Sequence, residues 1–197
     1  AAELLHSAGA AVFVSDKGPI SDAAKERLQT RGIAFEEGGH SAAASDGAFA
    51  VVSPGVPTHA PLVQTYLSQH KEVVSEIELA SWFIESPIVA VTGSNGKTTV
   101  SSWIAHLFET AQLPYRLAGN IGMAFSEQVG REHGQDAVGS TRKKHHWVLE
   151  VSSFQLDHVH CFSPKVSVIL NISADHMDRY NHSIDDYAQA KFRLTEH

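Results

Sequence analysis

The strongest constraint on the fold is a glycine-rich turn between two segments of different periodicity. An apolar, largely β-branched run, Ile88–Thr92, ends at Gly93, and a segment with helical spacing of apolar residues follows Gly96. This order predicts a strand, a tight turn and a helix over 88–108. Glycines let backbone N–H groups line a concave surface, and the N-terminus of the helix adds positive potential there. The turn therefore predicts a phosphate-binding loop.

The residues of this turn suit a nucleoside triphosphate. Lys97 can reach the outer phosphates, and the hydroxyl of Thr98 can bind Mg²⁺. The common pattern has four residues between its glycines, whereas only two separate Gly93 from Gly96, and Val91 stands where the outer glycine would be. An ordinary turn before a helix is the alternative, but the order of strand, glycines, lysine and helix favours a nucleotide. The candidate loop consists of Gly93, Ser94, Asn95, Gly96, Lys97, Thr98 and Thr99.

Composition narrows the class of protein. The chain has 197 residues, 43% of them hydrophobic, which suits one large domain or two small ones. Its formal charge of -7 disfavours a broad nucleic-acid-binding face, since such faces are basic. The single cysteine, Cys161, allows no intrachain disulfide. With no signal-peptide pattern and no apolar run of membrane-spanning length, we expect a cytoplasmic protein without membrane insertion.

Strand patterns alternate with helical patterns along the chain, which predicts an α/β fold with parallel sheets. A boundary at Glu85-Ser86-Pro87 separates a Rossmann-like domain over 1–85 from a P-loop-type central ATPase domain over 86–197. Polar residues 130–145, with a basic run at 142–144, predict an exposed loop. The expected strands are 11–16, 33–36, 49–53, 73–75, 88–92, 147–151 and 166–170, and the expected helices are 1–8, 21–30, 61–69, 76–83, 97–111 and 184–196.

Three further positions could contribute chemistry. Glu150 ends a predicted strand and could bind Mg²⁺ beside a triphosphate, although a helix-capping or exposed edge position is the alternative. His176 lies in Asp175-His176-Met177-Asp178-Arg179, a dense polar stretch after another strand, which could instead be a solvated loop. Lys191 lies in the last predicted helix, where composition alone favours a surface lysine.

Taken together, these motifs resemble those of the Mur ligases, most closely the type that adds D-glutamate to UDP-N-acetylmuramoyl-L-alanine. The phosphate loop and the Asp-His-x-Asp-Arg stretch are shared across the family, and two other stretches indicate the D-glutamate-adding type. The matching stretches are 53–57, 75–80, 93–99, 119–122, 150–156, 171–180 and 187–193, in family order.

The resemblance implies an ATP- and Mg²⁺-dependent ligase of peptidoglycan synthesis that acts through an acyl phosphate. It implies that Lys97 and the loop amides hold the phosphates, and that Thr98 and Glu150 hold one Mg²⁺. His176 would bind a second Mg²⁺, and Lys191 would act as a carbamylated side chain beside it. The catalytic residues implied are Lys97, Asn120, His176 and Lys191.

The resemblance also implies where the sugar substrate binds. Asn120 and Ser152 would contact the muramoyl-alanine part, and the first segment would hold the UDP end through Asp16, Ser53, Pro54 and Gly55. The opening strand of the family, the end of its central domain and its third domain have no counterpart in the sequence. We therefore expect this chain by itself to be an inactive fragment, truncated at both ends. A sister Mur ligase, a non-catalytic nucleotide-binding module and a folylpolyglutamate-type synthetase are the alternatives, the last disfavoured by the Ser-Pro-Gly turn.

Overall fold

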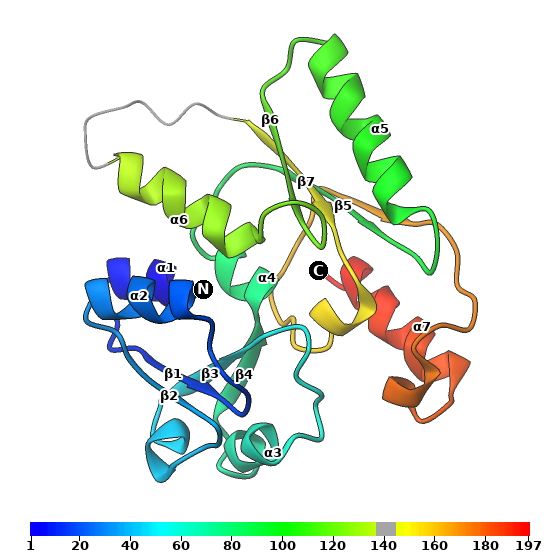
Figure 1. Ribbon diagram of the computed structural model, residues 1–197. Helices are drawn as coiled ribbons and strands as arrows, with labels where there is room; N and C mark the ends of the chain where they lie inside the picture. The colour runs from blue at the N-terminus through cyan, green and yellow to red at the C-terminus, as the bar shows by residue number, and fades with distance from the viewer. Residues whose placement is uncertain (137–144) are drawn as a thin grey trace.

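The computed structural model describes residues 1–136 and 145–197, and every strand pairing in it is parallel (Figure 1). Two small sheets lie in the first part of the chain, and a larger sheet has the order β6-β7-β5-β8. This arrangement confirms the predicted α/β class with parallel sheets. The small sheets pair β1 (Phe13–Asp16) with β2 (Ala34–Glu37) and β3 (Phe49–Val52) with β4 (Glu72–Ser75). The larger sheet consists of β5 (Ile88–Thr92), β6 (Tyr115–Gly119), β7 (His146–Glu150) and β8 (Val166–Ile169).

Several helices begin at serines whose hydroxyls accept from the backbone of the first turn. Ser21 caps α2 (Asp22–Thr30) and Ser75 caps α4 (Glu76–Ser81) in this way, and Ser183 caps α7 (Ile184–Phe192). No helix within the described ranges is long and apolar enough to cross a membrane. The helices are α1 (Ala2–Ser7), α2 (Asp22–Thr30), α3 (Pro61–Ser68), α4 (Glu76–Ser81), α5 (Lys97–Thr110), α6 (Phe125–Asp136) and α7 (Ile184–Phe192), with short 3-10 turns η1 (Ala42–Ser45), η2 (Ser153–Gln155), η3 (Met177–Tyr180) and η4 (Arg193–Thr195).

The larger sheet is covered on both faces. Successive residues of β7 from Trp147 to Glu150 are all buried, although their side chains alternate between the two faces. Trp147 and Leu149 belong to the same apolar cluster as Phe125 of α6, which places α6 over one face. Helix α5 packs against β5, β6 and β7. In Figure 1 the two helices lie on opposite sides of these strands. Burial on both faces explains why β5 and β7 read as continuous apolar runs.

The largest apolar cluster contains side chains from both parts of the chain. Leu4 of α1 and Ile77 of α4 are buried in it together with Phe125 and Val129 of α6. The boundary predicted near residue 85 falls between α4 and β5, and it stays a prediction.

Two features of the second part differ from the sequence prediction. The predicted loop over 130–145 was wrong over 130–136, because α6 continues to Asp136. Among residues 125–133, the buried apolar side chains are Phe125 and Val129, and the glycine and charged residues that follow hide the helical pattern. Strand β6 was not predicted, since Arg116 and Gly119 weaken its apolar pattern. The basic run at 142–144 lies outside the described residues.

Candidate nucleotide-binding site

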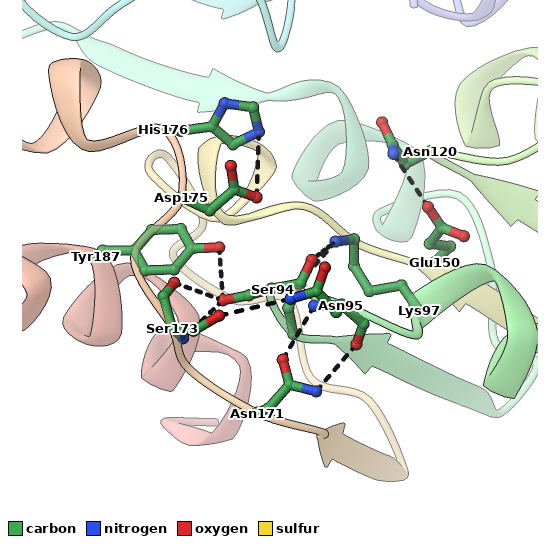
Figure 2. Close-up of polar contacts among 11 residues, drawn as sticks. Ser94, Asn95, Lys97, Asn120, Glu150, Asn171, Ser173, Asp175, His176 and Tyr187 are labelled. Atoms are coloured by element: carbon green, nitrogen blue, oxygen red, sulfur yellow. Dashed lines mark hydrogen bonds and ion pairs between the residues drawn. The ribbon is translucent and has the colours of Figure 1, made fainter.

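The parallel order of the larger sheet brings four strand ends to one edge. The glycine-rich loop follows β5, Glu150 ends β7, Asn120 follows β6, and Asn171 comes two residues after β8. Figure 2 shows these side chains around the loop, with α7 contributing Tyr187. In α/β sheets, ligands bind at the carboxyl ends of the strands. The loop and Glu150 therefore occupy the edge where the sequence predicted a site.

Both glycines of the loop are required by its geometry. Gly93 has φ 154°, and a Cβ there would lie 3.0 Å from the Cβ of Leu170. Gly96 has φ 83°, a left-handed conformation, and it is the N-cap of the 14-residue helix α5. The chain can thus pass close to β8 and then enter α5 within three residues.

The loop is fixed to the segment that follows β8. The Asn95 N–H donates to Asn171 Oδ1 at 3.0 Å, and Asn171 Nδ2 donates to the Asn95 carbonyl at 3.1 Å. Ser94 Oγ donates to the Ser173 carbonyl at 2.9 Å and accepts from the Ser173 N–H at 2.9 Å. Because a hydroxyl has one proton, the Tyr187 hydroxyl, 3.2 Å from Ser94 Oγ, must donate to it. Ser94 Oγ is then fully hydrogen-bonded, which holds the loop in one conformation.

Lys97 is folded back over its own loop. Its ammonium group donates to the carbonyl oxygens of Gly93 at 2.8 Å and Ser94 at 2.9 Å. Figure 2 shows the side chain running along the loop rather than toward Glu150. The positive charge is therefore kept above the loop, where the phosphates of a nucleotide would lie.

Thr98, Glu150 and Asn120 form a second group of contacts beside the loop. Thr98 Oγ1 donates to Glu150 Oε2 at 2.7 Å, and Asn120 Nδ2 donates to Glu150 Oε1 at 3.0 Å. The Asn120 N–H also donates to the Glu150 carbonyl at 2.8 Å. Gly119 has φ 97°, and a Cβ on it would overlap the Glu150 carbonyl oxygen. A glycine at 119 is therefore what allows the ends of β6 and β7 to approach this closely.

The donor set of this group suits Mg²⁺. Two oxygen ligands on adjacent corners of a Mg²⁺ octahedron lie about 2.9 Å apart, since each bond is 2.0–2.1 Å. The hydroxyl of Thr98 and the carboxylate of Glu150 are 2.7 Å apart, and Glu150 is only 2% exposed. Both are hard oxygen donors at the end of the phosphate loop, so the residues present fit the ion.

Lys191 is buried in α7, contrary to what composition alone favoured. The residue is 1% exposed, and its ammonium nitrogen lies 4.4 Å from the ring centroid of Tyr187. Burial, the largest cause, and the charge of Lys97 together lower the pKa of Lys191 to about 8, although the charge of Asp175 opposes the shift. Through Tyr187, which bonds Ser94, the buried lysine is linked to the phosphate loop.

His176 lies apart from the Thr98–Glu150 pair. Its backbone is left-handed, with φ 51°, and its side chain is 54% exposed. Its Nε2 is 3.8 Å from Asp175 Oδ2, and its ring meets that of Phe154 with centroids 5.7 Å apart. Within the described ranges, no three His, Cys, Asp or Glu side chains come together as a metal site. The second metal position implied by the resemblance thus stays a prediction.

The positions predicted for the sugar substrate divide into two groups. Ser152 is buried two residues after the end of β7, at the same sheet edge as the loop, and its N–H donates to Gln155 Oε1 at 2.9 Å. Asp16 ends β1, where it is exposed and accepts from the Gly18 N–H at 2.8 Å. The remaining three lie in the turn after β3, in a different sheet from Asp16; these are Ser53, Pro54 and Gly55. In the part of the chain that is described, no hydrogen bond joins Asp16 or the turn at 53–55 to the glycine-rich loop at 93–99.

Three residues that hold the loop were not predicted as site residues. Asn171 and Ser173 lie just before the polar stretch at 175–179, and Tyr187 opens the pattern that contains Lys191. A polar residue immediately after a buried strand was the available signal for Asn171. Nothing in the spacing indicated that the Tyr187 hydroxyl would reach Ser94, since this contact depends on how α7 packs.

The fold and the loop define the structural class of the protein. It is an α/β protein of the P-loop-like type, with a glycine-rich loop between a parallel strand and a helix. The chain belongs to the Mur ligase family. The family model described as Mur ligase middle domain matches residues 91–197, and the model described as MurD N-terminal domain matches residues 2–62.

Curated relatives match nearly the whole chain. The UDP-N-acetylmuramoylalanine--D-glutamate ligase of Salinibacter ruber is 47% identical over 199 residues, which cover 98% of this chain and 41% of the relative. The ligase of the same name from Bacteroides thetaiotaomicron is 41% identical over 197 residues, covering 100% of this chain and 42% of the relative. The chain thus spans about two fifths of the length of these relatives.

Solved structures show the same fold at lower identity. A UDP-N-acetylmuramate:L-alanyl-gamma-D-glutamyl-meso-diaminopimelate ligase from Neisseria meningitides is 18% identical, with a TM-score of 0.52, over 98% of this chain and 63% of that chain. A UDP-N-acetylmuramate-alanine ligase from Thermotoga maritima is 20% identical, with a TM-score of 0.51, over 98% of this chain and 43% of that chain. These similarities concern the fold alone.

Proposed function

We propose that the complete gene product is a cytoplasmic, ATP-dependent ligase that adds D-glutamate to UDP-N-acetylmuramoyl-L-alanine during the synthesis of peptidoglycan precursors. The observation that carries this proposal is the arrangement of Lys97, Thr98 and Glu150 at one sheet edge, with Lys191 buried nearby. The family membership and the names of the relatives at 41–47% identity support the choice of substrates.

The reaction proceeds in two steps. A carboxylate oxygen of the alanyl group attacks the γ-phosphorus of ATP, the bond to the β-phosphate oxygen breaks, and ADP leaves. The amine of D-glutamate then attacks the acyl carbon, phosphate departs, and the nitrogen loses a proton. Both steps bring negatively charged groups together, so the protein must supply positive charge and oriented donors.

The phosphate loop supplies most of these groups. Lys97 exchanges the carbonyl oxygens of Gly93 and Ser94 for phosphate oxygens, and the backbone N–H groups at the start of α5 face the same anion. Thr98 and Glu150 would hold Mg²⁺ through the oxygen pair described above. When bound, the ion neutralises phosphate charge. Asn120 keeps the Glu150 carboxylate aimed at this position through its side-chain amide.

The remaining roles follow from the resemblance and from burial. His176 would be a ligand of a second Mg²⁺ close to the substrate carboxylate, and Lys191 would act in the same region. The lowered pKa of Lys191 leaves part of the amine neutral, the form that reacts with CO₂ to give a carbamate. Ser152 and Asn120 contact the muramoyl-alanine part. The UDP end lies along Asp16 and along the turn formed by Ser53, Pro54 and Gly55.

The test is a measurement of ADP release by the complete gene product with UDP-N-acetylmuramoyl-L-alanine and D-glutamate. Lys97→Ala removes the ammonium that faces the phosphates, so we expect turnover to fall by about 100-fold or more. Lys165→Ala, which removes an exposed lysine after Cys161, is the matched control and should keep the parent rate. Full activity of the Lys97→Ala protein would overturn the phosphate-loop assignment.

The same assay separates the D-glutamate-adding ligase from its sister enzymes. We expect ADP release to require D-glutamate, with L-alanine or a diamino acid giving no turnover above background. Turnover with another amino acid in place of D-glutamate would instead identify a sister ligase. ATP binding without ADP release under every combination would indicate a nucleotide-binding module.

A further inference from the structure

Phe154 is contacted by two side chains from one short turn. The ring of His176 meets the Phe154 ring with centroids 5.7 Å apart and planes 74° apart. The guanidinium carbon of Arg179 lies 5.2 Å from the centroid of the same ring. The Arg179 N–H donates to the His176 carbonyl at 3.0 Å, so the backbone fixes the spacing of these two residues. Phe154 therefore connects the imidazole to the guanidinium.

Arg179 also reaches the first part of the chain. Its Nη2 donates to the Val56 carbonyl at 2.9 Å, directly after the turn at 53–55. The Arg179 side chain is only 17% exposed and lies 3.5 Å from the carboxylate of Asp157, which is 10% exposed. One largely buried guanidinium therefore bonds the turn after β3 and covers the ring of Phe154.

Few contacts orient the imidazole of His176. Its side chain is 54% exposed, and within the described residues its side-chain contacts are with Asp175 and Phe154. The Asp175 contact is long, at 3.8 Å, and Asp175 is itself 44% exposed. An exposed ion pair of this kind constrains geometry weakly. The aromatic contact is consequently the main fixed restraint on the ring.

We infer that Arg179 is a positioning residue: through its bond to Val56 and its contact with Phe154, it relates the position of the turn at 53–55 to the orientation of the His176 imidazole. The inference rests on the proposed function, in which the turn holds the UDP end and His176 faces the reacting carboxylate. When the UDP end of the substrate binds the turn, the imidazole is then fixed where the carboxylate at the other end of the substrate would lie. Only a planar guanidinium can donate in its plane to Val56 while its face covers an aromatic ring.

The first test is Arg179→Lys in the complete gene product. Lysine keeps the charge beside Asp157 but loses the planar face, so we expect kcat to fall about tenfold while KM for ATP stays within about twofold. Arg193→Lys is the matched control, because Arg193 Nη1 lies 3.3 Å from the same Asp157 carboxylate without contacting Phe154. We expect its kcat to stay within about twofold of the parent. An unchanged kcat for Arg179→Lys would overturn the inference.

A double-mutant cycle with His176→Ala shows whether Arg179 acts through the imidazole. If it does, Arg179→Lys causes no further loss of kcat in the His176→Ala background. If the loss of kcat in the double variant equals the product of the losses in the two single variants, Arg179 acts independently of His176, and the inference is overturned. Loss of turnover in Phe154→Leu, which leaves the Arg179–Asp157 pair in place, is expected for the same reason. Parent-like turnover of Phe154→Leu would refute the inference even if the Arg179 variant fails to fold.

The failure of this inference is distinguishable from failure of the proposed function. Parent-like turnover of His176→Ala would contradict the role of His176 in the proposed reaction. An inactive His176→Ala protein together with a fully active Arg179→Lys protein would refute the positioning role alone. A spectroscopic readout completes the test: we expect the ring-proton chemical shifts of His176 to change in Arg179→Lys, since the Phe154 ring current depends on their geometry. Unchanged shifts would contradict the inference.

Discussion

Lys191 is the clearest example of one residue whose environment changes its chemistry. Burial, together with the nearby charge of Lys97, lowers its pKa to about 8, from the ordinary lysine value of about 10.4. At pH 7 the neutral amine is then about a tenth of the total, against fewer than about one in a thousand at the ordinary pKa. The neutral amine carries the lone pair that attacks CO₂. The surroundings of Lys191 thus favour the modification that the resemblance implies.

This environment gives a prediction for Lys191→Ala in the complete gene product. We expect ADP release to fall by about 100-fold or more, because the oxygens of the proposed carbamate would be lost. Added formate or acetate should restore part of the rate, since a small carboxylate can enter the space left by the side chain. The assay is ADP release with and without the added carboxylate, and Lys165→Ala serves as the control. A parent-like rate without any added carboxylate would show that Lys191 has no part in the reaction.

At the scale of elements, the site depends on how closely β6 and β7 approach each other. The two strands pair from Tyr115 with His146 to Gly119 with Glu150, so the last pair of the register carries the candidate metal ligand. Asn120 follows immediately and bonds both the backbone and the side chain of Glu150. The glycine at 119 is therefore a requirement of the sheet edge and, through Asn120, of the site.

Gly119→Ala tests this requirement. The added Cβ would overlap the Glu150 carbonyl in a left-handed backbone, so we expect the protein to lose about 1–3 kcal/mol of stability and ATP to bind more weakly. Gly122→Ala is the control: it has φ 68° but no atom within 4 Å of the added Cβ. Urea unfolding and ATP titration measure the two effects. Equal losses for both variants would mean that backbone strain alone, and not the close approach to Glu150, accounts for the effect.

The sequence predicted the elements whose pattern is independent of tertiary contacts. Strand β5 and its loop were predictable because a continuous β-branched run ends at glycines. The place of Glu150 at the same sheet edge was predictable because the carboxyl ends of parallel strands lie together. Helix α6 was not, since its buried stripe contains little beyond Phe125 and Val129. The Tyr187–Ser94 contact was also beyond prediction, because it joins positions 93 residues apart through the packing of α7.

At the scale of the whole molecule, the first and second parts of the chain share an apolar core. Leu4 of α1 is 2% exposed in the cluster that contains Phe125 and Trp147. Glu78 of α4 adds a polar connection: its buried carboxylate accepts from the N–H groups of His160 and Phe162, at 3.0 and 2.9 Å. A buried carboxylate with several donors is costly to separate from them. We therefore expect the described parts to unfold together.

Leu4→Ala tests this cooperativity. Truncation of a fully buried leucine should lower the free energy of unfolding by about 2–5 kcal/mol, whereas Leu113→Ala, at a position 46% exposed, should change it by less than about 0.5 kcal/mol. Unfolding is followed by far-ultraviolet circular dichroism and by the fluorescence of Trp147, with Trp82 and Trp103 replaced by Phe. Coincident shifts of both signals are expected. A Trp147 transition that stays at the parent midpoint would show that the two parts unfold separately.

The hydrogen bonds between the phosphate loop and residues 171–173 have a consequence for affinity. Ser94 and Asn95 are held by hydrogen bonds to Asn171 and Ser173, which belong to the folded chain itself. The conformational entropy of ordering the loop is therefore lost when the protein folds, and little of it is deducted from the free energy of binding. A substitution at Asn171 would in this way alter the affinity of the proposed nucleotide site through the order of the loop, so the segment that follows β8 contributes to binding together with the loop itself.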